Sequence, residues 1–305
     1  MCIIVESTGE KLSVKGTADF CNGVRKLMKK YLDNVRCVAP LIHNITNYVT
    51  ANDVANVLLA CGASPIMADE EAEVEEITAH CMGLNLNLGT PNQKKIPAML
   101  KAGKMANKLG HVVVLDPVGV GASSFRKQTA EQLLREVRFD VVRGNISEIK
   151  TLASLCGTQE KNSENGRGVD ADDTDTVTEE NLSQHISNAK MLSKKLQTIV
   201  AITGAIDLVT DGSGCYVIRN GNPQMSHVTG AGCQLSGILT AFLAANPENK
   251  LQAAAAAVCM MGYAGEIAAE KSGQSGSGTY RVNLMDAVSC MDGDMLERGA
   301  RYEIR

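Results

Sequence analysis

The chain has few aromatic residues and no strong excess of charge of either sign. Phe, Trp and Tyr make up 3% of its 305 residues, and Trp is absent. The 30 Lys and Arg residues are nearly balanced by 34 Asp and Glu residues, which gives a net charge of −4. A nucleic-acid binder needs a cationic surface for the phosphates and aromatic faces for the bases. We therefore expect no nucleic-acid partner.

Membrane-spanning runs and paired-cysteine motifs are not apparent either. The longest alanine-rich run, Leu251–Gly265, is shorter than the ~20 residues that cross a bilayer. Residues Met1–Lys15 lack a basic leader, so no signal peptide is expected. The ten cysteines show no Cys-x-x-Cys spacing, which is typical of reduced thiols in a cytosolic protein. These features predict a cytoplasmic protein without a membrane contact.

Short apolar runs alternate with helix-length segments through most of the chain. Continuous apolar runs of this length indicate strands of a mostly parallel sheet, buried between helices. The predicted strands are Cys37–Ile42, Ser64–Met67, Leu84–Leu88, Val112–Leu115, Asp140–Val142 and Ile199–Ile202. We therefore predict an α/β fold.

Other segments add helices and a hairpin to this pattern. The helical segments are Ala18–Tyr31, Ala51–Ala60 and the chain from Ala231 onward, broken at Asn246-Pro247 and at Gly273–Gly278. Two strand-like runs within Asp207–Arg219 flank a turn of the type that joins antiparallel strands.

The domain organisation is expected to be simple. No linker separates two apolar cores, so residues 1–305 are predicted to form a single domain. Residues 1–15 carry no informative pattern and are expected to be flexible. The stretch Gly157–Arg167 is polar and lacks apolar periodicity, which favours an exposed loop or insertion.

A glycine-rich turn, Val228–Cys233, precedes the predicted helix Gln234–Ala245. Gly230 and Gly232 let the backbone turn tightly there and leave its N–H groups bare. A helix N-terminus favours negative charge, so the segment predicts an anion site beside the Cys233 thiol. A plain helix entry accounts for the same glycines, and this alternative is favoured when the motif is taken alone.

Polar residues also follow several predicted strands, where ligands gather in parallel sheets. Asp116 is suited to Mg²⁺ or to a reacting hydroxyl, although a turn aspartate is equally expected. Glu148 fits a second Mg²⁺-linked carboxylate, but with Asn145 it also has the spacing of a capping box. Arg143 and Thr203 are placed for nucleotide phosphates, although a turn threonine is the commoner identity for a residue like Thr203. Together these groups predict phosphoryl transfer, yet the sequence contains no P-loop.

Five motifs in order carry a resemblance to a known family. They are Pro40–Asn47, Gly62–Met67, Asp116–Gly119, Arg143–Ile149 and Val228–Cys233. The set resembles hydroxyethylthiazole kinase, of the ribokinase-like superfamily, over roughly Pro40–Ala287. The resemblance implies a three-layer fold without a separate lid domain. It also implies ATP-dependent phosphorylation of the alcohol of 4-methyl-5-(2-hydroxyethyl)thiazole in thiamine salvage.

The resemblance further implies a role for each site residue. Asn47, Met67 and Gly230 would contact the thiazole, and Arg143, Thr203 and Asn145 would contact ATP. Asp116 and Glu148 would organise Mg²⁺. Cys233, with Gly230 and Gly232, would form the catalytic centre, in the place where most ribokinase-like enzymes have an aspartate. Trimers with active sites at subunit boundaries are also implied.

Several alternatives remain open at this stage. Met67 can equally be a core methionine, Asn47 a helix cap, and His43 is expected to be structural. Rival functions are a kinase for a hydroxymethylpyrimidine or pyridoxal-type precursor, a non-catalytic thiazole or nucleotide sensor, and an ADP-dependent dehydratase. Cys233 itself is not expected to be a strong base, because a neighbouring triphosphate opposes its ionisation.

Overall fold

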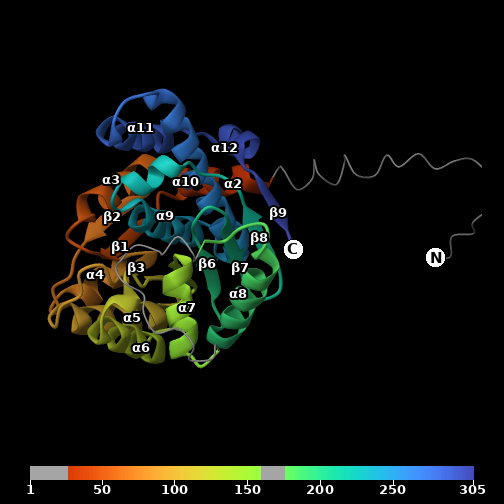
Figure 1. Ribbon diagram of the computed structural model, residues 1–305. Coiled ribbons are helices and arrows are strands. Elements are labelled where there is room, and N and C mark those ends of the chain that lie inside the picture. The colour runs from red at the N-terminus through yellow and green to blue at the C-terminus, as the bar shows by residue number, and fades with distance from the viewer. Residues whose placement is uncertain (1–26, 159–175) are drawn as a thin grey trace, which may run out of the picture.

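The computed structural model describes residues 27–158 and 176–305. The predicted flexible segment 1–15 and most of the predicted loop 157–167 lie outside these residues. In the described part, nine strands form one sheet in the order β2-β1-β3-β4-β5-β6-β7-β8-β9 (Figure 1). The strands are β1 (Leu41–Ile45), β2 (Ser64–Met67), β3 (Gly83–Asn87), β4 (Val112–Asp116), β5 (Val141–Gly144), β6 (Ile199–Ile202), β7 (Asp207–Thr210), β8 (Cys215–Ile218) and β9 (Tyr302–Ile304).

The sheet has a parallel part and an antiparallel part. The pairs from β2 to β6 are all parallel, and β6 to β9 are antiparallel. The parallel sheet and the β7–β8 hairpin confirm the predictions from sequence. Strand β9 was not predicted, because Tyr302–Ile304 is short and lies among charged residues. It pairs with β8 and so extends the antiparallel edge.

Helices cover both faces of the sheet and give three layers (Figure 1). One face carries α2 (Leu27–Val38), α3 (Ala51–Cys61), α9 (Ala231–Ala245), α10 (Lys250–Ser272), α11 (Ser277–Cys290) and α12 (Gly293–Gly299). The other carries α4 (Val74–His80), α5 (Lys95–Leu109), α6 (Ser124–Glu136), α7 (Ile146–Leu155) and α8 (Leu182–Leu196).

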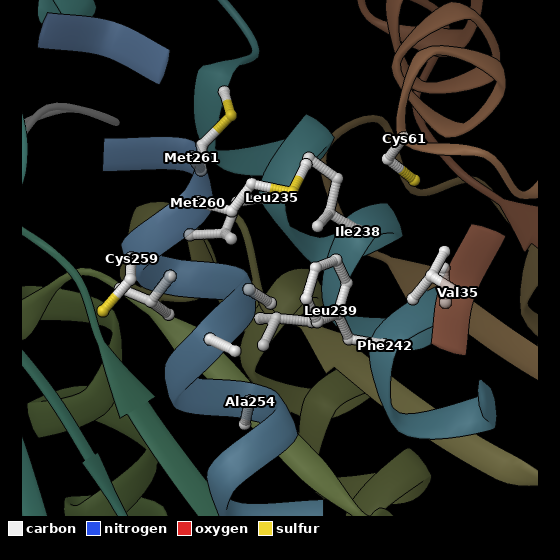
Figure 2. Packing of buried hydrophobic residues seen from close by; sticks show 14 of the residues in the cluster. Val35, Cys61, Leu235, Ile238, Leu239, Phe242, Ala254, Cys259, Met260 and Met261 are labelled. Carbon is white, nitrogen blue, oxygen red and sulfur yellow. The ribbon is translucent and has the colours of Figure 1, made fainter. Parts of the chain in front are cut away.

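Each face has its own apolar core. Figure 2 shows the packing around α9 and α10, where Phe242 and Leu239 lie close to one another and Met260 lies near Leu235. Phe242, Leu239 and Met260 are all fully buried. Truncation of such a buried Phe to Ala costs roughly 3–5 kcal/mol, because a cavity remains. This packing therefore stabilises the position of helix α9, which carries the glycine-rich turn at its start.

The first predicted strand is placed too early in the chain. Cys37 and Val38 belong to α2, which ends before Ala39, a residue with φ of 47°. Strand β1 begins at Leu41 and continues through the polar residues His43 and Asn44. These side chains are tolerated inside the sheet because both make hydrogen bonds there.

The long apolar helix α10 exceeds the apolar run read from the sequence. In the described part of the chain, one helical stretch, Pro247–Ser272, is long and apolar enough to cross a membrane by length and composition alone. However, 72% of its apolar window is buried in the fold. The small side chains of Ala253–Ala257 instead allow close packing at the centre of one core.

Candidate active site

The carboxyl ends of five parallel strands meet the N-terminus of α9. Asn47 follows β1, Asn87 ends β3 and Asp116 ends β4. Arg143 lies in β5, and Thr203 follows β6. Hydrogen bonds and close approaches link these residues to Cys233 or to one another. This edge is where ligands bind in open α/β sheets.

Helix α9 begins without a side-chain cap. Its N-cap residue, Gly230, has φ of 84°, a conformation that glycine adopts without strain. A side chain at position 230 would also collide with the methyl group of Thr50. The N-cap residue therefore offers no side-chain acceptor to the first N–H groups of the helix, and such groups can bind an anion.

The guanidinium of Arg143 lies across this turn. A Cβ atom at Gly232 would sit 2.6 Å from Nη2 of Arg143 and closer still to its Nη1. Nη2 donates a hydrogen bond to Oγ1 of Thr203 at 2.5 Å, and Nη1 lies 3.6 Å from Oδ1 of Asp116. Nε of Arg143 is buried and has no hydrogen-bond partner within residues 27–158 and 176–305. A fixed cation thus faces the bare N–H groups of α9.

Two asparagine amides converge on the thiol of Cys233. Nδ2 of Asn47 approaches Sγ at 3.3 Å, and Nδ2 of Asn87 approaches it at 3.2 Å. Asn87 also donates to Oδ2 of Asp116 at 2.7 Å, and Ser236 donates to the same oxygen at 2.8 Å. Oδ1 of Asp116 is buried and accepts no hydrogen bond from the described part of the chain. The network therefore leaves one oxygen of this carboxylate with no donated hydrogen bond, and its charged neighbour is Nη1 of Arg143 at 3.6 Å.

Burial controls the protonation of the acidic groups here. It raises the pKa of Asp116, while the nearby Arg143 charge and the donated hydrogen bonds act in the opposite direction. Burial also raises the pKa of Cys233, and the charge of Asp116 raises it further. Both effects favour the protonated thiol, despite its position near a helix N-terminus.

Glu148 and Asn145 close the start of a second helix, α7. Oδ1 of Asn145 accepts the N–H of Glu148, and Oε2 of Glu148 accepts the N–H of Asn145, each at 2.8 Å. This is the capping box that the spacing allowed. Oε1 of Glu148 accepts the N–H of Gly119 at 2.8 Å, which ties α7 to the turn after Asp116.

The carboxylates of Asp116 and Glu148 fit Mg²⁺ bound together with a phosphate ligand, rather than a metal ion whose ligands all come from the protein. Within residues 27–158 and 176–305, no group of three or more His, Cys, Asp or Glu side chains could hold a metal ion. Asp116 offers one unpartnered oxygen, and Glu148 is the second carboxylate near it. Mg²⁺ is usually held by one or two carboxylates together with substrate phosphates. These residues therefore fit a Mg²⁺ ion that arrives with a phosphate ligand.

Comparisons with known proteins show the family of this chain. The hydroxyethylthiazole kinase family model matches residues 32–294. The hydroxyethylthiazole kinase of Clostridium acetobutylicum is 55% identical over 278 residues, covering 91% of this chain and 99% of its own. The chain belongs to the hydroxyethylthiazole kinase family. A second family member, from Desulfovibrio desulfuricans, is 45% identical over 90% of this chain and 96% of its own.

Solved structures place the family fold among ribokinase-like proteins. Hydroxyethylthiazole kinase from Pyrococcus horikoshii superimposes with a TM-score of 0.80 at 32% identity, covering 92% of this chain and 99% of its own. A pyridoxal kinase from Staphylococcus aureus gives a TM-score of 0.58 at 15% identity, covering 87% of this chain and 98% of its own. The second likeness shows the fold alone. The predicted three-layer, ribokinase-like architecture is confirmed.

The structure gathers most of the site residues predicted for this family member, but not all of them. Asn47, Asp116, Arg143, Thr203 and Cys233 meet at one edge through the contacts described above. Gly230 and Gly232 lie in the turn that these residues face, whereas Asn145 and Glu148 lie at the adjacent α7 junction. Met67 ends the edge strand β2, is 40% exposed, and takes no part in these hydrogen bonds.

Two members of the hydrogen-bond network were missed from the sequence. Asn87 ends a strand in which polar and apolar residues alternate, and this pattern could have drawn attention to it. Ser236 lies in an apolar helix. No sequence signal distinguishes it from a serine whose hydroxyl donates only to a backbone carbonyl of its own helix. His43 is buried with both ring nitrogens hydrogen-bonded, which agrees with its expected structural role.

Proposed function

We propose that this family member transfers the terminal phosphoryl group of ATP to the hydroxyl of 4-methyl-5-(2-hydroxyethyl)thiazole, in thiamine salvage. The proposal depends on one observation above all: the uncapped N-terminus of α9 faces the fixed guanidinium of Arg143 beside Cys233 and Asp116. Bare N–H groups opposite a partly buried cation form a cradle for a transferring phosphate.

Arg143 and Thr203 would hold the ATP phosphates on one side of that cradle. Their mutual hydrogen bond fixes the guanidinium, and its buried Nε has no hydrogen-bond partner among the residues that the structure describes. Asn145 would reach ATP only through its amide nitrogen, since its oxygen caps α7. A group preorganised in this way stabilises developing charge without reorganising during the reaction.

Asn47, Met67 and Gly230 would bind the thiazole on the opposite side. Asn47 supports this role because it contacts the Cys233 sulfur. Cys233 would orient the substrate hydroxyl, and its protonated thiol argues against strong base catalysis. Phosphoryl transfer through a loose transition state depends more on positioning than on early removal of the proton.

Mg²⁺, when bound with ATP, would neutralise charge on the phosphates. Oδ1 of Asp116 and the carboxylate of Glu148 would hold it, partly through water. Replacing both residues by Ala is expected to abolish most turnover. Normal Mg²⁺-dependent kinetics in the folded double variant would contradict this assignment.

We further propose a cytoplasmic homotrimer in which each chain is a single kinase domain without a separate lid. Exposed apolar side chains beside the site support an intersubunit location for it: Tyr48 is 68% exposed, Val49 63% and Met67 40%. Burying them against another copy would be favourable. Light scattering of the purified protein should give three times the chain mass, and a monomeric active enzyme would contradict the trimer.

The proposed function is tested by measuring ATP consumption with thiazole, pyrimidine and pyridoxal alcohols. We expect ADP and the thiazole monophosphate to form in equal amounts, in a reaction that requires Mg²⁺. Turnover with hydroxymethylpyrimidine or pyridoxal alone would favour the rival kinases. Binding of both ATP and thiazole without turnover would indicate a sensor, and lyase activity without a phosphorylated alcohol would indicate a dehydratase.

A further inference from the structure

Lys95 is a buried cation that none of the roles above uses. It is the first residue of α5, and its side chain is only 5% exposed. A positive charge in the first turn of a helix is unfavourable, because the helix dipole is positive at that end. Stabilisation of α5 therefore does not explain this lysine.

The Lys95 ammonium group makes three contacts in different segments. Nζ donates to the carbonyl oxygen of Thr46 at 2.8 Å and lies 3.0 Å from Oδ2 of Asp69. It also lies 3.9 Å from the centre of the Tyr48 ring. An ammonium has three N–H donors, so these contacts account for all of its capacity. The group is thus fully committed to holding protein segments together.

Those segments carry the proposed thiazole contacts. Asn47 lies between Thr46 and Tyr48, and its amide reaches the Cys233 sulfur. Met67 is two residues before Asp69, at the end of β2. We propose that Lys95 is a positioning residue for the thiazole, because it joins the two substrate-side segments after β1 and β2 at a fixed spacing. This inference rests on the proposed function and names a determinant of its substrate side.

Loss of the ammonium would not leave a buried charge without a partner. The Asp69 side chain is 47% exposed, so water can solvate it when Lys95 is replaced. What would be lost is the donor to the Thr46 carbonyl and the contact with the Tyr48 ring face. The expected consequence is a looser segment around Asn47 rather than an unfolded protein.

The same helix offers a matched control. Lys101 of α5 pairs with Glu71, two residues beyond Asp69, at 2.9 Å. Its side chain is 45% exposed, and that of Glu71 is 44% exposed. Lys101→Met therefore removes an ion pair between α5 and the segment after β2 without touching Thr46 or Tyr48. Exposed pairs of this kind contribute little to stability.

The test is steady-state kinetics with each substrate varied, together with calorimetric titration of hydroxyethylthiazole in the absence of ATP. For Lys95→Met we expect a rise of about tenfold in the KM and Kd for the thiazole, with kcat and the KM for ATP changed by less than about twofold. Lys101→Met should change every parameter by less than about twofold, and Lys95→Arg, which keeps the cation, should lie between Lys95→Met and wild type.

Equal effects of Lys95→Met and Lys101→Met, or a parallel rise in the KM values for both substrates, would overturn the proposal. If Lys95→Met does not fold, Asp69→Asn decides the matter, with Glu71→Gln as its control. Asp69→Asn should raise the thiazole KM by about threefold, and no difference from Glu71→Gln would also overturn it.

Failure of this inference and of the proposed function are separable. If wild-type protein phosphorylates a different alcohol, the proposed function fails, and the Lys95 variants are then compared on that alcohol. If wild type phosphorylates the thiazole and the two lysine variants behave alike, only the role of Lys95 fails.

Discussion

Two helices begin at the same edge of the sheet, and their first turns are built in opposite ways. At the start of α7, the Asn145 and Glu148 side chains satisfy backbone N–H groups reciprocally. At the start of α9, Gly230 contributes no side chain, and no cap is present. Helix α7 follows the parallel strand β5 directly, whereas α9 follows the antiparallel strand β8 and the short helical turn Pro223–His227. The two helix starts therefore differ in their capping residues and also in the chain that leads into them.

The comparison shows how one protein can have a helix N-terminus that is stabilised by its own side chains and another that is left open to a ligand. A capped end is stabilised by its own side chains and has few donors left for a ligand. An uncapped end leaves its donors bare, and it is tolerated here because α9 is buried along almost its whole length. Substitutions at and around the two ends should therefore have effects of different size and kind, and the largest is expected at the uncapped end.

Filling the uncapped turn should cause the largest loss. Gly232→Ala places a methyl group where the Arg143 guanidinium lies, so the cation must move away from the bare N–H groups. We expect kcat/KM for ATP to fall by about 10³-fold, equivalent to about 4 kcal/mol. Stability should hardly change, since Ala is a better helix former than Gly. Steady-state kinetics and chemical denaturation measure the two effects.

Gly214→Ala is the matched control for this variant. An added Cβ at position 214 meets no atom within 4 Å, so wild-type kinetics are expected. If Gly232→Ala retained activity within about tenfold of wild type, the uncapped turn would not be the phosphate cradle.

The next prediction concerns the buried carboxylate of Asp207. It accepts one backbone N–H, from Gly204, whereas the Glu148 carboxylate at the capped junction accepts two. Burial raises the pKa of Asp207 from 3.8 to about 7. Between these values the folded state holds more protons than the unfolded state, so the unfolding free energy should fall as pH rises through this window. The upper limit is about 4 kcal/mol.

Urea denaturation at pH 5 and pH 8 should therefore show a smaller pH dependence for Asp207→Asn than for wild type. Asp211 lies on the same hairpin and serves as a control, because its pKa is shifted in the opposite direction. Burial opposes its ionisation, but hydrogen bonds from Ser213 and Gly214 lower the pKa of Asp211 overall. A pH dependence of Asp207→Asn equal to that of wild type would contradict the raised pKa of Asp207.

Removing the side-chain cap of α7 should have a smaller effect, and this effect should fall on stability more than on turnover. Asn145→Ala removes the cap of α7 and should lower the unfolding free energy by about 1 kcal/mol. Turnover should remain within about tenfold of wild type, because the bare N–H groups of α9 are untouched. A stable but inactive variant would show that Asn145 acts mainly on ATP instead.

The smallest effect is expected at the thiol beside the uncapped turn. Cys233→Asp keeps an acceptor for the amides of Asn47 and Asn87, and a carboxylate suits two N–H donors better than sulfur does. Activity should stay within about tenfold of wild type or improve. An inactive Cys233→Asp that retains the wild-type circular dichroism spectrum would contradict an orienting role for Cys233.

The parallel strands and the hairpin could be located from the sequence, because short apolar runs bounded by turn residues are typical of buried strands. Strand β1 was misplaced, since His43 and Asn44 are buried polar residues whose partners come from distant segments. Strand β9 was missed, because its pairing with β8 joins residues far apart in the chain. Local patterns carry no information about such partners.

The sequence by itself determined the elements of the site: the glycines before α9, the acid after β4 and the arginine in β5 all stand in local motifs. Only the tertiary structure decided that Asn87 and Ser236 converge on Asp116, that the Cys233 thiol stays protonated, and that Lys95 joins two segments after different strands. Hydrogen-bond partners and burial depend on which chain segments meet in space, and residue order alone does not fix that.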